Sequence, residues 1–265
     1  MQVVFNGEFM PAEEATIGIT EPGVLYGEGC FETLRLHQGK PRFFAEHWQR
    51  FTQAIQTLGI TIDTHTEIVC EQIIGLAQRN QIANGVARFS CHQTQTGADF
   101  AIIVSPPRRH PQPASFRVTI SQWPHPGPSS YSGIKHNNYA LFRAAHQQAR
   151  ADGWDECLLI NAQQEIVEGA ISNVFWVDEE NHMCTPPLGC GALPGIIRAR
   201  IIKLFPKVVE RAPHRDELAR AKEVFLTNSS FEIMPVSELD GRRFTKSAER
   251  TTCVMARFQE AYPDC

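Results

Sequence analysis

The sequence lacks several patterns that would assign it to well-known classes of protein. No apolar stretch approaches the roughly 18 residues that a transmembrane helix needs. The N-terminus, MQVVFNGEFMPAEE, has neither the basic flank nor the apolar run of a signal peptide. None of the eight cysteines forms a C-x-x-C pair, and the net charge of −4 comes without a basic cluster. We therefore expect no membrane span and no nucleic-acid partner, and we expect free thiols in a reducing, cytoplasmic setting.

The signatures of three kinds of catalytic site are missing too. The ten histidines are spread without the spacing of metal ligands, so we expect no metal. Cys30 has no cysteine–histidine signature around it, which argues against a thiol hydrolase. The segment GEGCFE at 27–32 lacks the third glycine of a dinucleotide-binding loop. A non-catalytic binding protein stays an alternative, because a fold does not determine a function.

The chain is long enough for one large domain or two medium ones. It has 265 residues, of which 42% are hydrophobic and 20% charged, as in ordinary globular proteins. Residues 105–114, SPPRRHPQPA, hold four prolines and are too proline-rich for a helix or a central strand. We predict a linker there, between a small α/β domain at 1–104 and a larger domain at 115–265.

Hydrophobic periodicity predicts regular elements in both domains. In the first domain we expect helices at 46–58 and 66–77, and strands at 2–5, 31–36, 85–91 and 101–104. In the second we expect strands at 116–121, 157–160, 166–167, 171–177, 224–227 and 234–236. Helices are expected there at 138–151, 196–205 and 245–261. Pro22-Gly23 is interpreted as a break in the chain.

Lys135 follows a Pro/Gly/Ser-rich loop and precedes a predicted helix, with Ile134 beside it. Most lysines are solvated at the surface, and that is the alternative for this one. A lysine held among apolar groups loses its proton more readily and becomes a nucleophilic amine. A Schiff base with pyridoxal phosphate needs such an amine. The sequence therefore makes Lys135 a candidate for that bond.

Glu168 lies in an apolar stretch, IVEGAISNVFW at 166–176. A carboxylate buried there needs a partner, because otherwise it would take up a proton. The protonated nitrogen of a pyridine ring is such a partner, and the pair keeps the ring able to accept electrons. The alternative is a turn or bulge glutamate beside Gly169.

Two segments are candidates for a phosphate site. Gly195-Ile196-Ile197 opens a predicted helix after Pro194, where unpaired N–H groups favour an anion. Asn228-Ser229-Ser230 offers hydroxyl donors just past a strand, although such clusters are mostly turns. Arg50 on the first helix could add positive charge, and its alternative is an exposed helix arginine.

Six motifs follow one another in a recognisable order: YGEGCFETLR at 26–35, FFAEHWQRF at 43–51, GIKHNNY at 133–139, EGAISNVFW at 168–176, GALPGIIRARII at 191–202 and TNSSFEIMPV at 227–236. Together they resemble the fold-type-IV, or class IV, pyridoxal-phosphate enzymes. That family includes branched-chain aminotransferases, D-amino-acid aminotransferases and 4-amino-4-deoxychorismate lyases. The resemblance covers nearly the whole chain. It implies a two-domain α/β (α+β) fold with a small α/β N-terminal domain, a larger β-barrel-like C-terminal domain with helices, and a homodimer.

The resemblance also implies a role for individual residues. Lys135 would be the catalytic Schiff-base lysine, Glu168 the partner of the pyridine nitrogen, and Arg50 a ligand of the phosphate. The backbone of Ile196 and Ile197 and the hydroxyl of Ser229 would bind the same phosphate, and Tyr139 would approach the ring hydroxyl. Five residues would line the substrate side: Tyr26, Phe31, Thr33, Arg35 and Arg88.

Within the family, GIKHNNY and TNSSFEIMPV resemble most the aminodeoxychorismate lyases. Such a lyase eliminates pyruvate and leaves 4-aminobenzoate, a folate precursor. Many of them carry an arginine- and glycine-rich strand after the second helix. Here that region is ARFSCHQTQTG at 87–97, with Arg88 and His92 but without the Arg-Gly run. The alternative is therefore an aminotransferase that exchanges an amino group between a branched-chain or D-amino acid and a 2-oxo acid.

Overall fold

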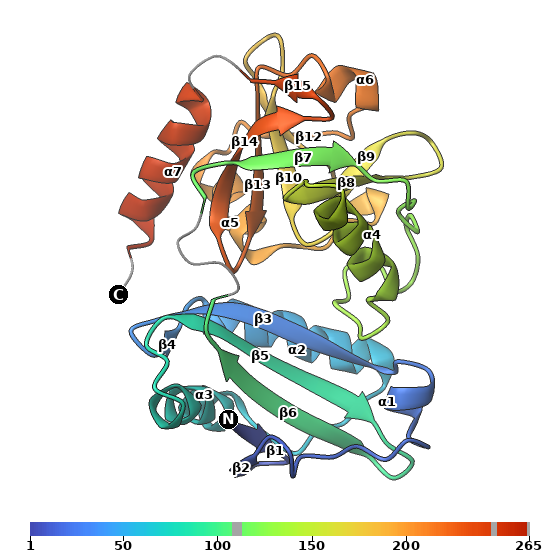
Figure 1. Cartoon of the computed structure of the whole chain (residues 1–265), viewed down its shortest axis with the longest axis vertical. Coiled ribbons are helices and arrows are strands. Elements are labelled where there is room, and N and C mark those ends of the chain that lie inside the picture. Colours follow the sequence, from blue (N-terminus) through green and yellow to red (C-terminus); the bar gives the residue numbers. More distant parts are fainter. Residues whose placement is uncertain (108–112, 245–247, 264–265) are drawn as a thin grey trace. The chain divides into compact units, whose positions relative to one another are not determined.

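The computed structural model describes residues 1–107, 113–244 and 248–263. The chain divides into two compact units, shown in Figure 1. The N-terminal unit comprises Met1–His110 together with Ile134–Asn138, and the C-terminal unit comprises Pro111–Gly133 together with Tyr139–Cys265. Each unit is built on its own sheet, so the predicted mixed α/β class is confirmed. The middle of the predicted linker, residues 108–112, lies outside the described residues.

The N-terminal unit contains a six-stranded antiparallel sheet in the order β2-β1-β6-β5-β3-β4. Asn6 and Gly7 have positive φ angles of 49° and 89°, and they form the hairpin turn between β1 and β2, as an Asn-Gly pair favours. The interpretation of Pro22-Gly23 as a break in the chain is wrong, because these residues begin the short helix α1. Proline is well suited to the first position of a helix. The elements are β1 (Gln2–Phe5), β2 (Glu8–Pro11), α1 (Pro22–Leu25), β3 (Gly29–His37), β4 (Lys40–Pro41), β5 (Gly85–Gln93) and β6 (Ala98–Ser105).

Two helices, α2 (Phe44–Leu58) and α3 (Thr66–Arg79), pack on one face of this sheet (Figure 1). Gly59 ends α2 in the left-handed conformation, with φ at 69°, as its position in the sequence predicts. Between helices and sheet lies an apolar core that includes Leu34, Phe51, Ile73 and Phe89. On the other face, the short helix α1 approaches the end of β5, where Gly23 lies close to His92.

One edge of β3 pairs with β5. At the start of β3, the opposite edge pairs with a segment that is distant in the sequence. The N–H of Phe31 donates to the carbonyl of Lys135 at 2.9 Å, and the N–H of Asn137 donates to the carbonyl of Gly29 at 2.9 Å. Residues 134–138 therefore extend the sheet of the N-terminal unit, although the chain on both sides of them belongs to the C-terminal unit. A domain boundary placed at the proline-rich linker does not predict that residues 134–138 pair with the N-terminal unit.

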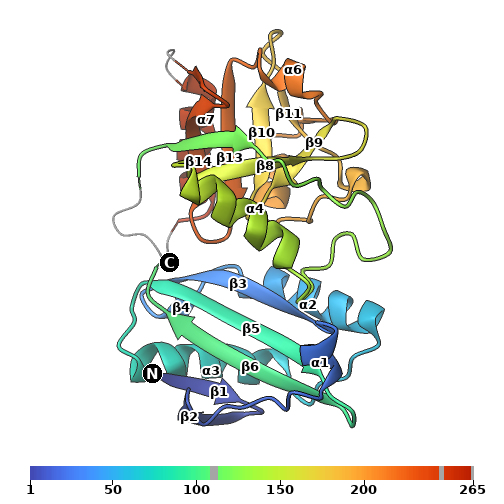
Figure 2. The ribbon, with the colours of Figure 1, turned by 45° about the vertical axis from the view of Figure 1, so that its right-hand side comes forward.

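The C-terminal unit contains a nine-stranded sheet in the order β12-β11-β10-β13-β14-β7-β8-β9, with β15 paired to β14. The sheet curls, as Figure 2 shows, and most pairs are antiparallel, whereas β7 runs parallel to both β8 and β14. The strands are β7 (Phe116–Ile120), β8 (Glu156–Ile160), β9 (Ile166–Gly169), β10 (Asn173–Val177), β11 (Met183–Thr185), β12 (Val209–Glu210), β13 (Glu223–Asn228), β14 (Glu232–Leu239) and β15 (Arg242–Arg243).

Helices cover this sheet as the predicted apolar faces require. Ala145 and Ala149 of α4 pack against Cys157 and Leu159 of β8. The helices are α4 (Ala140–Ala151), α5 (Ile196–Leu204), α6 (Arg215–Leu218) and α7 (Glu249–Ala261), with a 3₁₀ turn, η1 (Leu188–Cys190). The predicted start of the last helix, at 245, lies outside the described residues. In the described part of the chain, no helix combines the length and apolar character that crossing a membrane requires.

Candidate functional site

Four of the five predicted substrate-side residues share one face of the N-terminal sheet. Phe31, Thr33 and Arg35 alternate along β3, and Arg88 lies directly opposite Thr33 on β5. Their neighbours in sequence point to the helix-covered face, because side chains alternate along a strand. Tyr26, the fifth, follows α1 and is 66% exposed. The structure thus brings these four together, while their contact with a substrate stays a prediction.

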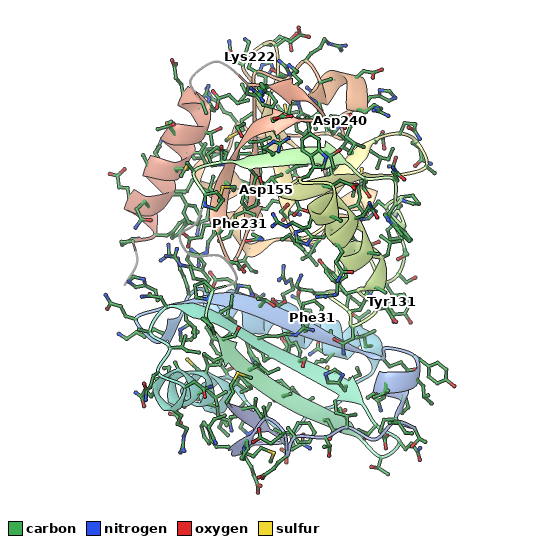
Figure 3. All side chains as sticks on the ribbon, viewed as in Figure 1. Phe31, Tyr131, Asp155, Lys222, Phe231 and Asp240 are labelled. Carbon is green, nitrogen blue, oxygen red and sulfur yellow. The ribbon has the colours of Figure 1, made fainter. Side chains whose placement is uncertain are left out.

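Lys135 lies over the ring of Phe31, which Figure 3 labels on β3. Its Nζ is 4.8 Å from the ring centroid, and the guanidinium carbon of Arg88 is 3.7 Å from the same centroid. Phe31 is buried and Lys135 is half-buried, so the lysine is not the fully solvated side chain of the alternative interpretation. The ring of Phe31 is thus within cation–π distance of both side chains.

Arg50 is part of a buried ionic cluster with Glu32 and His47. Its Nε and Nη2 donate to the two carboxylate oxygens of Glu32, each at 2.7 Å, and His47 Nδ1 donates to Oε2 at 2.7 Å. Burial alone would raise the pKa of Glu32, but the charge of Arg50 and the hydrogen bond from His47 lower it to about 2. Burial lowers the pKa of the His47 imidazole. Arg50 is therefore not an exposed helix arginine, and its role toward a phosphate stays a prediction.

Sequence reasoning missed Glu32 and His47, although a signal for Glu32 was available. On β3, Glu32 alternates with Cys30 and Leu34 on the face that α2 and α3 cover. A carboxylate at an inward strand position must find a partner. Arg50 on the helix packed over that face is such a partner, so strand alternation alone would have paired them.

Glu168 lies at the end of β9 in the C-terminal unit and is 7% exposed. Its Oε2 accepts hydrogen bonds from the N–H of Leu193 at 3.0 Å and from Nδ2 of Asn173 at 3.2 Å. Its Oε1 is 3.3 Å from Nε2 of His125. Glu168 is thus a buried strand residue with three partners. The register of β9 against β8 shifts between Ile166 and Glu168, so the irregularity that the alternative interpretation expects lies directly beside it. His125 was missed, because a single histidine in an irregular proline-rich segment carries no pattern.

Asn173 connects Glu168 to the start of α5. Its Nδ2 also donates to the carbonyl of Leu193 at 2.9 Å. A Cβ placed on Gly195, the residue just before α5, would lie 2.0 Å from Oδ1 of Asn173, so a glycine is required at this approach. No side chain caps the N-terminus of α5, whose first residues are Ile196 and Ile197. The first amides of α5 therefore offer the anion-favouring end that the sequence predicted.

Ser229 occupies a turn after β13 that is fixed by its neighbour. The side-chain oxygen of Asn228 accepts from the N–H of Ser230 at 2.8 Å, and its Nδ2 donates to the carbonyl of Ile171 at 3.0 Å. The turn is thereby tied to the loop that follows Glu168. On the same strand, the buried hydroxyl of Thr227 has no hydrogen-bond partner among the described residues.

Tyr139 precedes α4, and its hydroxyl donates to the carbonyl of Ala170 at 3.1 Å. Its ring stacks on Phe142 with centroids 4.9 Å apart. Tyr139 therefore lies beside the loop that follows Glu168, within the same unit. Its predicted approach to a ring hydroxyl stays a prediction.

Glu156 stabilises the loop that follows Glu168, and sequence reasoning also missed it. Its carboxylate accepts from the N–H of Cys157 at 2.9 Å, the hydroxyl of Ser172 at 3.1 Å and the N–H of Ile171 at 3.2 Å. Burial raises the pKa of Glu156 to about 7, against these hydrogen bonds. The residue begins β8, where an acid before an apolar run resembles an ordinary strand boundary.

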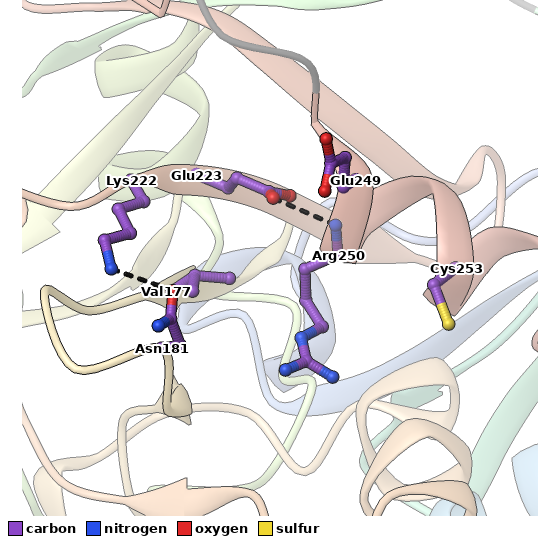
Figure 4. Close-up of a pocket in the computed structure, with 7 residues that line it drawn as sticks. All are labelled: Val177, Asn181, Lys222, Glu223, Glu249, Arg250 and Cys253. Carbon is purple, nitrogen blue, oxygen red and sulfur yellow. Dashed lines mark hydrogen bonds between the residues drawn. The ribbon is translucent and has the colours of Figure 1, made fainter.

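A cavity of about 260 Å³ in the C-terminal unit is not part of this arrangement (Figure 4). Val177 and Glu223 line it, and they pair at the opposite end of β10 and β13 from Asn173 and Thr227. Glu223 accepts from the N–H of Arg250 at 2.9 Å and so caps α7. The cavity is therefore accounted for by the start of a helix.

Asp178, Glu180 and His182 also gather near the end of β10, with one ligand atom of each within 4.8 Å of the others. Arg211 Nη2 donates to Oδ2 of Asp178 at 3.1 Å, so a cation already occupies this carboxylate. Glu180 and His182 are exposed. The group is explained as the stabilised turn between β10 and β11.

Comparison with known proteins places this chain among related sequences. A family model described as "Amino-transferase class IV" matches residues 29–239. A protein of Methanocaldococcus jannaschii named "Putative branched-chain-amino-acid aminotransferase" is 29% identical over 262 residues, which cover 91% of this chain and 89% of that protein. The aminodeoxychorismate lyase of Bacillus subtilis is 26% identical over 275 residues, covering 97% of this chain and 94% of the relative.

Solved structures share the fold over almost the full length. The branched-chain amino acid aminotransferase of Escherichia coli matches with a TM-score of 0.89 at 24% identity, covering 98% of this chain and 94% of that one. A structure from Legionella pneumophila titled "Putative 4-amino-4-deoxychorismate lyase" matches with a TM-score of 0.84 at 25% identity, covering 92% and 95%.

Proposed function

Because the chain belongs to the class IV aminotransferase family, whose members depend on pyridoxal phosphate, we propose that Lys135 binds this cofactor and that Glu168 pairs with its ring nitrogen. The observation that carries the proposal is the environment of Glu168. Its carboxylate is buried, yet its three hydrogen-bond partners are a backbone amide, a side-chain amide and an imidazole. A buried carboxylate without a cationic partner is suited to a cationic ligand group.

Each remaining residue has a task that its geometry supports. When bound, the cofactor supplies an aldehyde that captures amines and a ring that accepts electron density. Lys135 anchors that aldehyde and afterwards moves the proton at the amine-bearing carbon of the substrate. The amides of Ile196 and Ile197 and the hydroxyl of Ser229 bind the phosphate. Arg50, oriented by its ion pair with Glu32, is the side chain that donates to the same group.

Two features of the C-terminal unit fit the cofactor independently of the family. The start of α5 has no side-chain cap among the described residues, so its first amides are suited to an anionic ligand. The buried hydroxyl of Thr227 lacks a partner among the described residues and lies on the strand that leads to Ser229. The backbone amides at an uncapped helix N-terminus and a buried hydroxyl are both groups that can form hydrogen bonds with a phosphate.

We infer that the reaction is that of a 4-amino-4-deoxychorismate lyase, which releases pyruvate and 4-aminobenzoate. Its support is the motif resemblance around Lys135 and Ser229, together with the lyase relatives of similar length. Arg35 and Arg88 share the open face of the sheet with Phe31 and provide positive charge for a carboxylated substrate.

The second candidate is a class IV aminotransferase acting on a branched-chain or D-amino acid. Two observations favour it: the 29% identity to the archaeal branched-chain relative, and the absence of the arginine-glycine run from β5. In its place β5 carries Ser90 and His92 after Arg88, with the Ser90 hydroxyl 3.2 Å from Nε2 of His92.

One assay decides between the two reactions. The purified, cofactor-loaded protein is offered aminodeoxychorismate, and separately a panel of L- and D-amino acids with 2-oxoglutarate. Formation of 4-aminobenzoate supports the lyase, and formation of glutamate supports the aminotransferase. If neither product forms at any substrate concentration, both assignments are wrong.

A second assay tests the anchor. The protein is expected to show a visible absorbance band that Lys135→Ala abolishes, because the cofactor is no longer attached through its aldehyde. Lys40→Ala is the matched control, since Lys40 is an exposed lysine of the same unit. A band that survives unchanged in Lys135→Ala assigns the attachment to another amine.

We also propose a cytoplasmic homodimer. Support comes from a short exposed apolar segment around α1, formed by Ile19, Val24, Leu25 and Tyr26. Such a patch is more typical of a self-association surface than of solvent-facing chain. Sedimentation should give a dimer, and Leu25→Asp should shift it toward monomer.

The adjacent free thiols of Cys30 and Cys91, 3.6 Å apart, fit a reducing compartment.

A further inference from the structure

The contact between His125 and Glu168 has a defined polarity. Nδ1 of His125 accepts a hydrogen bond from the N–H of Gly127 at 3.0 Å, so this nitrogen carries no proton. The proton of the ring is therefore on Nε2, which lies 3.3 Å from Oε1 of Glu168 and donates to it. The backbone turn at 125–127 thus selects the neutral imidazole whose N–H points at the carboxylate.

The position of His125 is built by several independent contacts. Its backbone N–H donates to the carbonyl of Ile160 at 2.7 Å, and its ring meets the ring of Phe142 edge to face at 5.8 Å. Gly191 has a φ of 103°, and a Cβ there would lie 2.7 Å from the carbonyl oxygen of Gly127 and 3.0 Å from Cε1 of His125. His125 is 5% exposed. This is a fixed interior position, although the segment has no regular structure.

The choice of a neutral donor has an electrostatic consequence. Hydrogen bonds to an ionised carboxylate favour its charged form. His125 on Oε1, with Leu193 and Asn173 on Oε2, provides three such bonds without adding a positive charge. An arginine or lysine in place of His125 would also hold the carboxylate, but it would offset the charge that a ring nitrogen requires.

We propose that His125 is a positioning residue for Glu168: its neutral N–H holds Oε1 so that the carboxylate keeps one orientation and its full negative charge toward the pyridine nitrogen of the cofactor. The proposal rests on the role of Glu168 given under the proposed function. It adds a residue from outside the six family-like motifs, which no pattern in the sequence marks.

The test uses five variants and three measurements. His125→Leu removes the donor at similar volume, and His125→Gln restores an N–H donor at similar reach. Glu168→Gln removes the charge, and the double variant His125→Leu/Glu168→Gln completes a cycle. His182→Leu is the matched control, because His182 contacts Asp178 in the same unit at the same distance of 3.3 Å. For each, we measure the affinity of the apoprotein for pyridoxal phosphate, the visible absorbance band and the melting temperature of the apoprotein.

If the proposal is correct, His125→Leu weakens cofactor affinity about tenfold and shifts the absorbance band, as expected for losing a hydrogen bond to a charged group. His125→Gln stays within about threefold of wild type, since the donor is replaced. His182→Leu changes neither quantity. In the Glu168→Gln background, His125→Leu causes no further loss, because the charge it would position is already gone.

The outcomes distinguish the role proposed for His125 from the role of Glu168 on which it rests. If Glu168→Gln binds the cofactor with the affinity and absorbance of wild type, the pairing of Glu168 with the ring nitrogen is wrong. If Glu168→Gln weakens binding but His125→Leu does not, only the role of His125 is wrong. An equal loss from His125→Leu in both backgrounds means that His125 supports the fold alone, and this also overturns the proposal. Cofactor affinities are compared only at temperatures where the melting curves show every apoprotein to be folded. Reduced stability of His125→Leu therefore does not produce the expected loss of affinity by itself.

Discussion

Each unit of the molecule buries a glutamate on a strand, and the two are satisfied in opposite ways. Glu32 on β3 is 1% exposed and receives a bidentate bond from Arg50 and a bond from His47. Glu168 on β9 is 7% exposed and receives its bonds from two amides and a neutral imidazole. The charge of Glu32 is therefore matched within its own unit, whereas the described residues around Glu168 provide neutral donors only.

Burial alone therefore does not identify a ligand-binding acid. A carboxylate paired with a guanidinium has no charge left to offer, and its role is to orient that guanidinium. A carboxylate held by neutral donors is oriented but electrostatically unmatched, which a folded protein tolerates where a ligand supplies the opposite charge. The partners of an acid thus distinguish a supporting residue from a binding residue.

The largest effect is expected from Glu168→Gln. The substitution keeps the shape but removes the negative charge, so we expect turnover to fall by about 10²–10³-fold, the range for losing one preorganised electrostatic group. Cofactor stays bound, though more weakly, because Lys135 still anchors it. Single-turnover assays with the preferred substrate measure the loss. Near-normal turnover would show that the unmatched charge has no catalytic role.

Glu32→Gln is expected to act on stability instead. The pKa of Glu32 is lowered from 4.5 to about 2. A carboxyl with a lowered pKa stabilises the fold above pH 4.5 and loses that contribution as the pH falls toward 2. At pH 7 the shift corresponds to roughly 3 kcal/mol of unfolding free energy.

Denaturant titration at pH 7 measures this loss, and Glu71→Gln, an exposed acid on α3, is the control. Between pH 4.5 and 2, wild type should lose stability that Glu32→Gln has already lost. Equal stability of the variant and wild type at pH 7 would mean that the ionic cluster does not stabilise the fold.

Glu156 extends the comparison to an acid whose hydrogen bonds, in the described part of the chain, come from two backbone amides and a hydroxyl. Burial raises its pKa from 4.5 to about 7. A raised pKa means that the folded state binds the proton more tightly, so this contribution is complete below pH 4.5 and is lost as the pH rises through about 7. We expect wild type to lose more stability than Glu156→Gln over this interval. Melting temperatures at pH 5 and pH 8 measure the difference, with Glu260→Gln as an exposed control.

The smallest effect is expected from Arg50→Ala on cofactor affinity. Removing one charged hydrogen bond to the phosphate should weaken binding about tenfold. Equilibrium dialysis of pyridoxal phosphate measures it, and Arg79→Ala, on the other helix of the same unit, is the control. Unchanged affinity in Arg50→Ala would assign this arginine to Glu32 alone.

The elements of the fold were predictable where one periodicity dominates. The apolar spacing of α2 and α4 and the alternation of β3 gave these elements within a few residues of their observed bounds, and the Pro194-Gly195 pair gave the start of α5. The predicted end of α2 at residue 58 agrees with the observed one, where Gly59 adopts the left-handed conformation. In contrast, α1 begins with Pro22 and Gly23, residues that interrupt most helices, so local composition favoured the wrong interpretation.

The candidate site was predictable only in part, and the reason is physical. Lys135 and Glu168 stand out because each is a charged residue among apolar or small neighbours. His125 and Glu156 do not, since their importance comes from what lies beside them in space. The partners of His125 come from Gly127, Ile160 and Glu168, contacts made by folding that leave no spacing in the sequence.

The segment at 134–138 has a consequence for anyone who wishes to express the N-terminal half alone. A fragment ending in the proline-rich stretch would omit these five residues and leave Gly29 and Phe31 with unsatisfied backbone groups along a bare strand. Exposed strand edges of this kind recruit other chains and aggregate. A soluble truncation therefore needs the pentapeptide grafted back onto that margin, or a charged residue placed there to block intermolecular pairing.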